Sequence, residues 1–182
     1  IVAHDCSSVK LRRLILTSFF METRYNILFV CMGNICRSPA GENIFRHVVE
    51  DAGLSDHIHC DSAGTIGIHS GNNPDTRMSK TLRRRGYKVT GCARQFSLQD
   101  FGIFDLILVM DDENHRNILK LADTEEKRAK LQNFTNFCLH HHHHEVPDPY
   151  YGGDAGFQLV TDLIEDGSKG LIEHLKKELD LT

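Results

Sequence analysis

The stretch Asn26-Ile-Leu-Phe-Val-Cys-Met-Gly-Asn-Ile-Cys-Arg-Ser-Pro39 decides the fold of this chain. It begins with a continuous apolar run, which is typical of a strand buried on both faces of a sheet. Ser38 and Pro39 then predict the start of a helix, with Ser38 as its N-cap and Pro39 at the first helical position. Residues 31–37 therefore form a loop that runs from the end of a buried strand into the N-terminus of a helix.

Strand and helix patterns alternate along the rest of the chain. We expect further strands at 58–63, 104–110 and 130–134, and helices at 75–85, 111–121 and 156–179. The last helix should be loosened near Gly167. This alternation predicts a single three-layer α/β domain, with a small four-stranded parallel sheet and helices on both faces. Ligands of such sheets bind beyond the carboxyl ends of the strands, where the loop 31–37 lies.

The loop has the residue types of a phosphate site. Backbone N–H groups at a strand–helix junction can converge on one anion, and Gly33 and Asn34 tolerate the dihedral angles of a tight curl. Arg37 offers two parallel donors to phosphate oxygens. The resulting positive potential favours the thiolate form of Cys31, to which Ser38 can donate a hydrogen bond. The alternative is a buried core cysteine and a surface arginine, but the position of the loop favours chemistry.

Four stretches resemble the low-molecular-weight protein tyrosine phosphatases in one order and spacing. Residues 30–39 are similar to the active-site loop of that family. The others are 61–65, 108–114 and 148–153, of which the last resembles the acid loop. The resemblance covers about residues 25–180. It implies a cytoplasmic hydrolase that takes phosphate from phosphotyrosine-containing proteins or small aryl phosphates, without cofactor or metal, as a monomer or weak dimer.

The resemblance also implies the residue roles. Cys31 would be the nucleophile that forms a cysteinyl-phosphate, Arg37 the phosphate clamp and Asp148 the general acid and base. The chemistry independently requires a proton donor, because breaking a phosphate ester leaves an alkoxide or phenoxide. The other expected phosphate or substrate contacts are Met32, Gly33, Asn34, Ile35, Cys36, Ser38, Ile68, Tyr150 and Tyr151. Apolar Ile35 suits phosphotyrosine, whereas relatives that act on phosphoarginine tend to carry Thr there.

Two of these residues have additional or alternative readings. In the family, a cysteine at the position of Cys36 can close a reversible disulfide with the nucleophile under peroxide; alternatively, Cys36 only packs under the loop. Asp148 precedes a proline and could also be an ordinary turn residue. Asp111, at the end of a buried strand, is expected to hydrogen-bond near the loop and support it without a catalytic role.

Three features depart from the family pattern. A large aromatic usually stands near the position of Ile68 as one wall of the pocket, and here only His69 is adjacent. A histidine that props the loop asparagine is replaced by Gly91, so water or Ser62 would have to substitute. Five consecutive histidines, 140–144, precede the acid loop. We expect an exposed insertion that binds transition metals adventitiously, the alternative being a regulatory zinc or pH effect.

Composition narrows the class of protein. The chain has 182 residues, enough for one domain, and a formal net charge of -4 argues against nucleic-acid binding. No apolar run approaches the roughly 20 residues that span a bilayer, so we expect a soluble protein without membrane contact. Six cysteines lack the paired spacing of a zinc site and fit a reducing compartment.

The N-terminus looks foreign to the rest of the chain. We expect residues 1–20 to be a disordered extension or a non-native leader, with Met21 as the working start and a phosphatase domain at 21–182. A short targeting peptide is the alternative, because residues 10–20 are basic and then apolar.

Two rival functions remain on the sequence alone. A thioredoxin-coupled arsenate reductase uses a similar loop but needs two further cysteines, and only Cys92 lies near the expected region. A non-catalytic phosphoprotein-binding module would use the same phosphate cradle without turnover. Such a module has no use for a general acid, so Asp148 favours the enzyme.

Overall fold

The computed structural model describes residues 24–181. Its strands form one parallel sheet in the order β2-β1-β3-β4. The strands are β1 (Tyr25–Cys31), β2 (Ile58–Gly64), β3 (Leu106–Val109) and β4 (Leu131–Asn133). The helices are α1 (Arg37–Asp51), α2 (Thr76–Arg84), α3 (Asp100–Ile103), α4 (Asp112–Leu119), α5 (Glu125–Ala129) and α6 (Gly153–Glu178), with a 3-10 helix at Phe134–Phe137.

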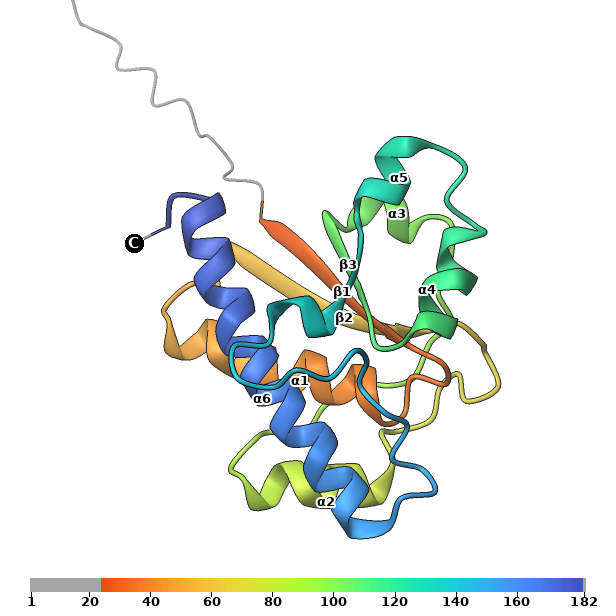
Figure 1. Cartoon of the computed structure of the whole chain (residues 1–182), viewed down its shortest axis with the longest axis vertical. Coiled ribbons are helices and arrows are strands. Elements are labelled where there is room, and N and C mark those ends of the chain that lie inside the picture. The colour runs from red at the N-terminus through yellow and green to blue at the C-terminus, as the bar shows by residue number, and fades with distance from the viewer. Residues whose placement is uncertain (1–23, 182) are drawn as a thin grey trace, which may run out of the picture.

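Alternate residues of the central strand β1 point into two separate cores, as expected for a strand covered on both faces. Ile27 and Phe29 pack into the core formed with α1 and α6. Leu28 and Val30 pack into the core on the other face, formed with α3 and α4. Figure 1 shows α1 and α6 together on one side and α3, α4 and α5 on the other. The predicted three-layer α/β architecture is therefore confirmed.

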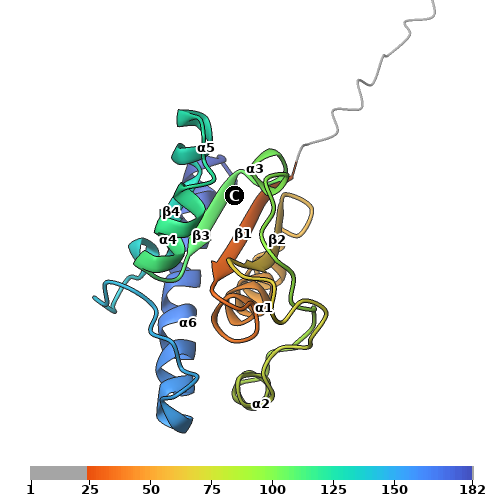
Figure 2. The same ribbon diagram turned by 90° about the vertical axis from the view of Figure 1, so that its right-hand side faces the viewer.

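Because all strand pairs are parallel, the carboxyl ends of β1, β2 and β3 meet at one edge of the sheet. The backbone N–H of Met110 donates to Val30 O at 3.1 Å, and the N–H of Thr65 donates to Cys31 O at 2.8 Å. Figure 2 shows the loop after β1 turning into α1 at this edge, on the side of α2. The edge thus gathers the loop 31–37, the turn after β2 and Asp111, which lies two residues after the end of β3.

The start of α1 differs from the prediction. The helix begins at Arg37, and its N-cap residue is Cys36, which makes no side-chain capping hydrogen bond. Ser38 is therefore not the N-cap, and Pro39 occupies the third helical position, which is still within the first turn, where proline is tolerated. The reason is that the Ser38 hydroxyl points back to the sheet, where it lies 3.0 Å from Cys31 Sγ and donates to Ala63 O at 3.2 Å.

The predicted loosening of α6 near Gly167 is wrong, because the helix is continuous through that residue. Glycine is needed there for close packing: a Cβ on Gly167 would lie 2.5 Å from Phe134 Cζ. Gly170 is tighter still, since its Cβ would lie 1.9 Å from the backbone oxygen of Phe137. The two glycines let α6 approach the 3-10 helix that follows β4.

This close approach makes Gly170→Ala destabilising, although alanine is the better helix former. We expect a loss of about 1–3 kcal/mol in the free energy of unfolding, as for other overpacked cores. Gly156→Ala is the matched control on the same helix, because its Cβ would make only ordinary contacts at 3.5 Å or more. It should be neutral or stabilise by up to about 1 kcal/mol. Urea denaturation measures both, and equal stability of the two variants would contradict this packing.

The expectations for residues 1–20 and for the domain start at 21 concern residues 1–23, which lie outside the described residues. Within residues 24–181, no helix combines the length and the hydrophobicity that crossing a membrane requires.

Candidate active site

The loop between β1 and α1 closes on itself at the carboxyl edge of the sheet. Asn34 adopts a left-handed conformation with φ 54°, which asparagine tolerates better than most residues. The backbone N–H of Ile66 holds the rim of the loop by donating to Met32 O at 3.1 Å. A Cβ on Gly64 would lie 2.8 Å from the same Met32 oxygen, so only glycine fits at this end of β2. The predicted curl is present, but of its two residues Asn34 alone has a positive φ, whereas Gly33 leaves room for the ring of His69.

The Asn34 side chain supports this curl from beneath. Its amide nitrogen donates to Ser38 Oγ and to Ser62 Oγ, both at 2.9 Å, and its oxygen accepts from the backbone N–H of Arg94 at 2.8 Å. Ser62 in turn donates to Glu42 Oε2 at 2.6 Å. Burial raises the pKa of Glu42 above its ordinary value, against the opposing effect of this hydrogen bond. The sequence allowed either water or Ser62 to replace the missing histidine as the support of Asn34, and the structure shows Ser62 in that role.

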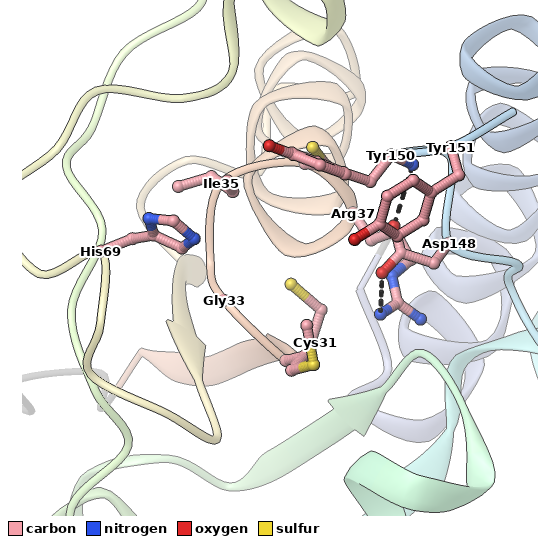
Figure 3. Close-up of a pocket in the computed structure, with 10 residues that line it drawn as sticks. Cys31, Gly33, Ile35, Arg37, His69, Asp148, Tyr150 and Tyr151 are labelled. Atoms are coloured by element: carbon pink, nitrogen blue, oxygen red, sulfur yellow. Dashed lines mark hydrogen bonds and ion pairs between the residues drawn. The ribbon is translucent and has the colours of Figure 1, made fainter. Parts of the chain in front are cut away.

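A cavity of about 240 Å³ opens above the loop. Cys31, only 3% exposed, lies at its floor with its sulfur beside Ser38 Oγ. Figure 3 shows Arg37, Asp148 and the two tyrosines along one side of the cavity, with His69 and Ile35 on the other. The lining residues are Cys31, Met32, Gly33, Ile35, Cys36, Arg37, His69, Asp148, Tyr150 and Tyr151. The predicted contacts Asn34 and Ser38 lie beneath this lining, fully buried.

Arg37 is buried and held by groups from two other parts of the chain. Its guanidinium forms an ion pair with Asp111, donates to Val146 O at 3.2 Å and lies 3.4 Å from Asp148 Oδ2. Burial alone would lower the pKa of Arg37, but negative charge on Cys31, Asp111 and Asp148 raises it above its ordinary value. Asp111 also accepts from the backbone N–H of Asn114 at 2.6 Å as the N-cap of α4. Its expected supporting contact near the loop is present.

Asp148 reaches the cavity from the segment that precedes α6. Its carboxylate is 41% exposed, so solvent and a leaving group can both reach it. Oδ1 accepts the backbone N–H of Tyr150 at 3.0 Å, while Oδ2 faces Arg37. The segment is anchored by Val146, whose N–H donates to Met110 O at 2.8 Å. Tyr150 and Tyr151 stand at the mouth of the cavity, with ring centroids 5.0 Å apart.

The prediction that Ile68 contacts the substrate as a wall of the pocket is wrong. Ile68 is 75% exposed and does not line the cavity. The neighbouring His69 takes that place, and its ring stands over the loop, since a Cβ on Gly33 would lie 2.9 Å from His69 Cδ2. The signal was present in the sequence, because His69 carries the one ring between residues 64 and 70.

Cys36 lines the same cavity as Cys31, and both are free thiols. Burial is the main cause that raises the pKa of Cys36 to about 12. At neutral pH Cys36 is therefore protonated and a poor nucleophile by itself. Both expectations for Cys36 stay open, because a buried, protonated thiol can pack under the loop or react with an oxidised neighbour.

The histidine tract is exposed as predicted, except that His141 is half-buried. The backbone N–H groups of His140 and His141 both donate to Asp166 Oδ2 at 2.9 Å, which fastens the tract to α6. At its other end, His144 Nε2 lies 3.1 Å from Asp112 Oδ2. Within residues 24–181 no three or more His, Cys, Asp or Glu side chains are grouped so that they could hold a metal ion.

The comparisons with known proteins agree with this geometry. Residues 26–181 match the family described as low molecular weight phosphotyrosine protein phosphatase. A Synechocystis protein, provisionally named as a low molecular weight protein-tyrosine-phosphatase, is 51% identical over 84% of this chain and 98% of its own. The crystal structure of a protein tyrosine phosphatase from Entamoeba histolytica is 41% identical, with TM-score 0.82 over 85% of this chain and 99% of its own.

A third relative broadens the range of organisms. The crystal structure of YfkJ from Bacillus subtilis is 39% identical, with TM-score 0.80 over 86% of this chain and 97% of its own. The matched region includes the whole loop 31–37, the cavity above it and the segment that carries Asp148. The chain belongs to the low molecular weight phosphotyrosine protein phosphatase family.

Proposed function

We propose that this chain hydrolyses phosphotyrosine and small aryl phosphates, with Cys31 as nucleophile, Arg37 as phosphate clamp and Asp148 as general acid and base. One observation carries the assignment: the Cys31 sulfur and the Arg37 guanidinium, both from the loop, line one small cavity with the Asp148 carboxylate, which lies 111 residues beyond Arg37 in the sequence. The cavity floor is a loop at a helix N-terminus, which stabilises an anion.

The reaction proceeds in two steps. Cys31 Sγ attacks phosphorus, so that an S–P bond forms while the bond to the leaving oxygen breaks, and Asp148 gives its proton to that oxygen. Water then attacks the cysteinyl-phosphate, Asp148 takes a proton from it, and the S–P bond breaks to release phosphate. Arg37 and the loop N–H groups stabilise the equatorial oxygens in both steps. Ser38 Oγ lies 3.0 Å from the sulfur, so its proton can turn from Ala63 O to the sulfur and stabilise the thiolate as attacking and leaving group.

The lining of the cavity supports an aryl substrate. Ile35 and the rings of His69 and Tyr150 border the opening, and aromatic pairs add about 0.5–1.5 kcal/mol beyond the burial of area. The preference is tested with phosphotyrosine, phosphoserine and phosphoarginine peptides of one sequence. We expect the phosphotyrosine peptide to be hydrolysed fastest, and the rate to be the same with and without chelator. A faster rate on the phosphoarginine peptide would contradict the assignment of Ile35.

The rival functions receive no support from the site. An arsenate reductase relay requires cysteines beyond the loop, but among residues 24–181 the only cysteines that line the cavity are Cys31 and Cys36, both in the loop. Cys92 is exposed and lies outside that lining. A binding module would not need a half-exposed carboxylate beside the arginine. The free thiols of the described chain suit a reducing cytoplasm, and a cytoplasmic monomer or weak dimer without nucleic-acid partners stays our prediction.

Asp148→Asn should slow the reaction according to the leaving group. Because asparagine cannot give a proton, kcat/KM for phenyl phosphate should fall by roughly 10²–10⁴-fold. For 2,4-dinitrophenyl phosphate, whose leaving group departs as a stable anion, kcat/KM should fall far less. Asp154→Asn, on an exposed residue in the first turn of α6, is the control and should behave as wild type. Equal loss for both substrates would reject Asp148 as the acid.

Cys36→Ser should convert reversible oxidation into permanent loss. Peroxide oxidises Cys31 to a sulfenic acid, and the Cys36 thiol then displaces water to form a disulfide that dithiothreitol reduces. Without Cys36, further peroxide carries Cys31 to the sulfinic acid. Recovery of activity by dithiothreitol should therefore be nearly complete in wild type and in Cys92→Ser, an exposed control, and small in Cys36→Ser. Full recovery in Cys36→Ser would show that Cys36 only packs.

A further inference from the structure

Arg77, near the start of α2, makes contacts that the proposed chemistry does not use. Its guanidinium Nη1 donates to Tyr150 O at 3.1 Å, and its Cζ lies 4.7 Å from the centre of the Tyr150 ring. The same Cζ lies 4.9 Å from the ring of Phe157, a buried residue of α6. Arg77 thus makes a hydrogen bond and a cation–π contact to Tyr150, in the segment that carries Asp148, and a second cation–π contact to α6, which follows that segment.

Asp75 fixes the orientation of this arginine. As the N-cap of α2 it accepts from the Arg77 backbone N–H at 2.8 Å, and its two oxygens accept from Nε at 3.2 Å and from Nη2 at 2.9 Å. This two-pronged pairing holds the guanidinium plane in one direction. The hydrogen bonds from Arg77 lower the pKa of Asp75 below its ordinary value. Asp75 therefore keeps its charge throughout the pH range of a neutral enzyme.

A continuous series of contacts through Asp75, Arg77 and Tyr150 connects the phosphate loop with Asp148. On one side, the Asp75 backbone N–H donates to Ile35 O of the phosphate loop at 2.8 Å. On the other side, Tyr150, which Arg77 holds by its carbonyl and its ring, donates its own N–H to Asp148 Oδ1 at 3.0 Å. The position of the carboxylate relative to the loop is thus set through Asp75, Arg77 and Tyr150. In Figure 3, Asp148 and Tyr150 come from one side of the cavity and His69 from the other, beside Ile35 of the phosphate loop.

We propose that Arg77 is a positioning residue that places the Asp148 carboxylate and the Tyr150 ring over the phosphate loop. This inference rests on the proposed function, since it requires Asp148 to be the proton donor. Arg77 touches neither phosphate nor leaving group and acts through Tyr150. Its loss should therefore weaken proton donation and leave the phosphate cradle intact.

The test is the leaving-group dependence of kcat/KM in Arg77→Ala. For phenyl phosphate we expect a loss of about 10-fold, a part of the 10²–10⁴ that a general acid contributes. For 2,4-dinitrophenyl phosphate the loss should stay below about 2-fold, because that substrate needs no proton. The Ki of inorganic phosphate should not change. Arg84→Ala is the matched control, since Arg84 lies exposed on the same helix and its side chain makes no hydrogen bond or ion pair within residues 24–181.

A double-mutant cycle with Asp148→Asn makes the test specific. Once Asp148 can no longer give a proton, Arg77→Ala should have little further effect on phenyl phosphate, because both changes remove the same interaction. Arg77→Lys retains the charge without the planar fork and should show an intermediate loss, so it decides the question if Arg77→Ala does not fold. Additive losses, or equal losses on both substrates, would overturn the role of Arg77 alone. Absence of leaving-group dependence in Asp148→Asn itself would overturn the proposed function, and the role of Arg77 with it.

Discussion

Cys31→Ser should abolish turnover while retaining phosphate binding. Serine preserves the size of the side chain, but a hydroxyl is a far weaker nucleophile than a thiolate unless a base takes its proton, and Asp148 has to be protonated during that attack. We expect kcat to fall by at least about 10⁴-fold, the scale seen when a nucleophile that acts together with its partner groups is removed. Steady-state rates with p-nitrophenyl phosphate measure the loss, and isothermal titration with inorganic phosphate or vanadate measures binding.

The control for this experiment is Cys92→Ser, the same change at an exposed cysteine outside the cavity. It should retain wild-type rates. Residual activity of Cys31→Ser within about 10-fold of wild type, where a lost nucleophile costs orders of magnitude, would mean that another group accepts the phosphoryl. Loss of phosphate binding would instead mean that the sulfur shapes the loop, and that its role as nucleophile is unproven.

Arg37→Ala should lose both turnover and phosphate binding. The guanidinium is the buried cation that faces the cavity, and its removal also leaves Asp111 without its ion-pair partner. We expect kcat/KM to fall by roughly 10³-fold or more, as for arginines that stabilise phosphoryl transfer elsewhere. Inhibition by inorganic phosphate should weaken in parallel, because ground state and transition state share this clamp.

Arg37→Lys separates charge from geometry. Lysine keeps the positive charge beside Asp111 and Asp148 but cannot present two parallel N–H groups to phosphate. It should remain folded by circular dichroism and thermal melting, and should still lose most of the activity. Near-wild-type kinetics of Arg37→Lys would show that a point charge is enough and that the fork of Arg37 is not used.

The sequence predicted the fold and the centre of the site because both depend on local patterns. The apolar run 26–30 followed by the loop 31–37 places a strand end and a helix start next to each other whatever the rest of the chain does. Parallel strands then bring Asp111 to the same edge. Local pattern could not show where the Ser38 side chain points. Serine is a residue type that favours the N-cap, but the Ser38 hydroxyl instead makes hydrogen bonds with Cys31, Asn34 and Ala63.

The errors share a physical origin in tertiary contacts. Gly167 reads as a helix weakener in isolation, and only the ring of Phe134 packed against it explains its presence in a continuous helix. The wall of the cavity is formed by His69 and not by Ile68, because Ile68, in the same turn, is exposed to solvent. The link from Arg77 to Tyr150 joins residues 73 positions apart, a separation that periodicity and spacing do not address.

Direct detection of the phosphoenzyme tests the central claim, that the Cys31 sulfur accepts the phosphoryl group. Wild-type enzyme is mixed with p-nitrophenyl phosphate, quenched in acid within its first turnovers and digested for mass spectrometry. We predict phosphate on the peptide that contains Cys31, attached to sulfur and absent from Cys31→Ser treated in the same way. Phosphate on any other residue, or full turnover without a phosphorylated peptide, would contradict the account.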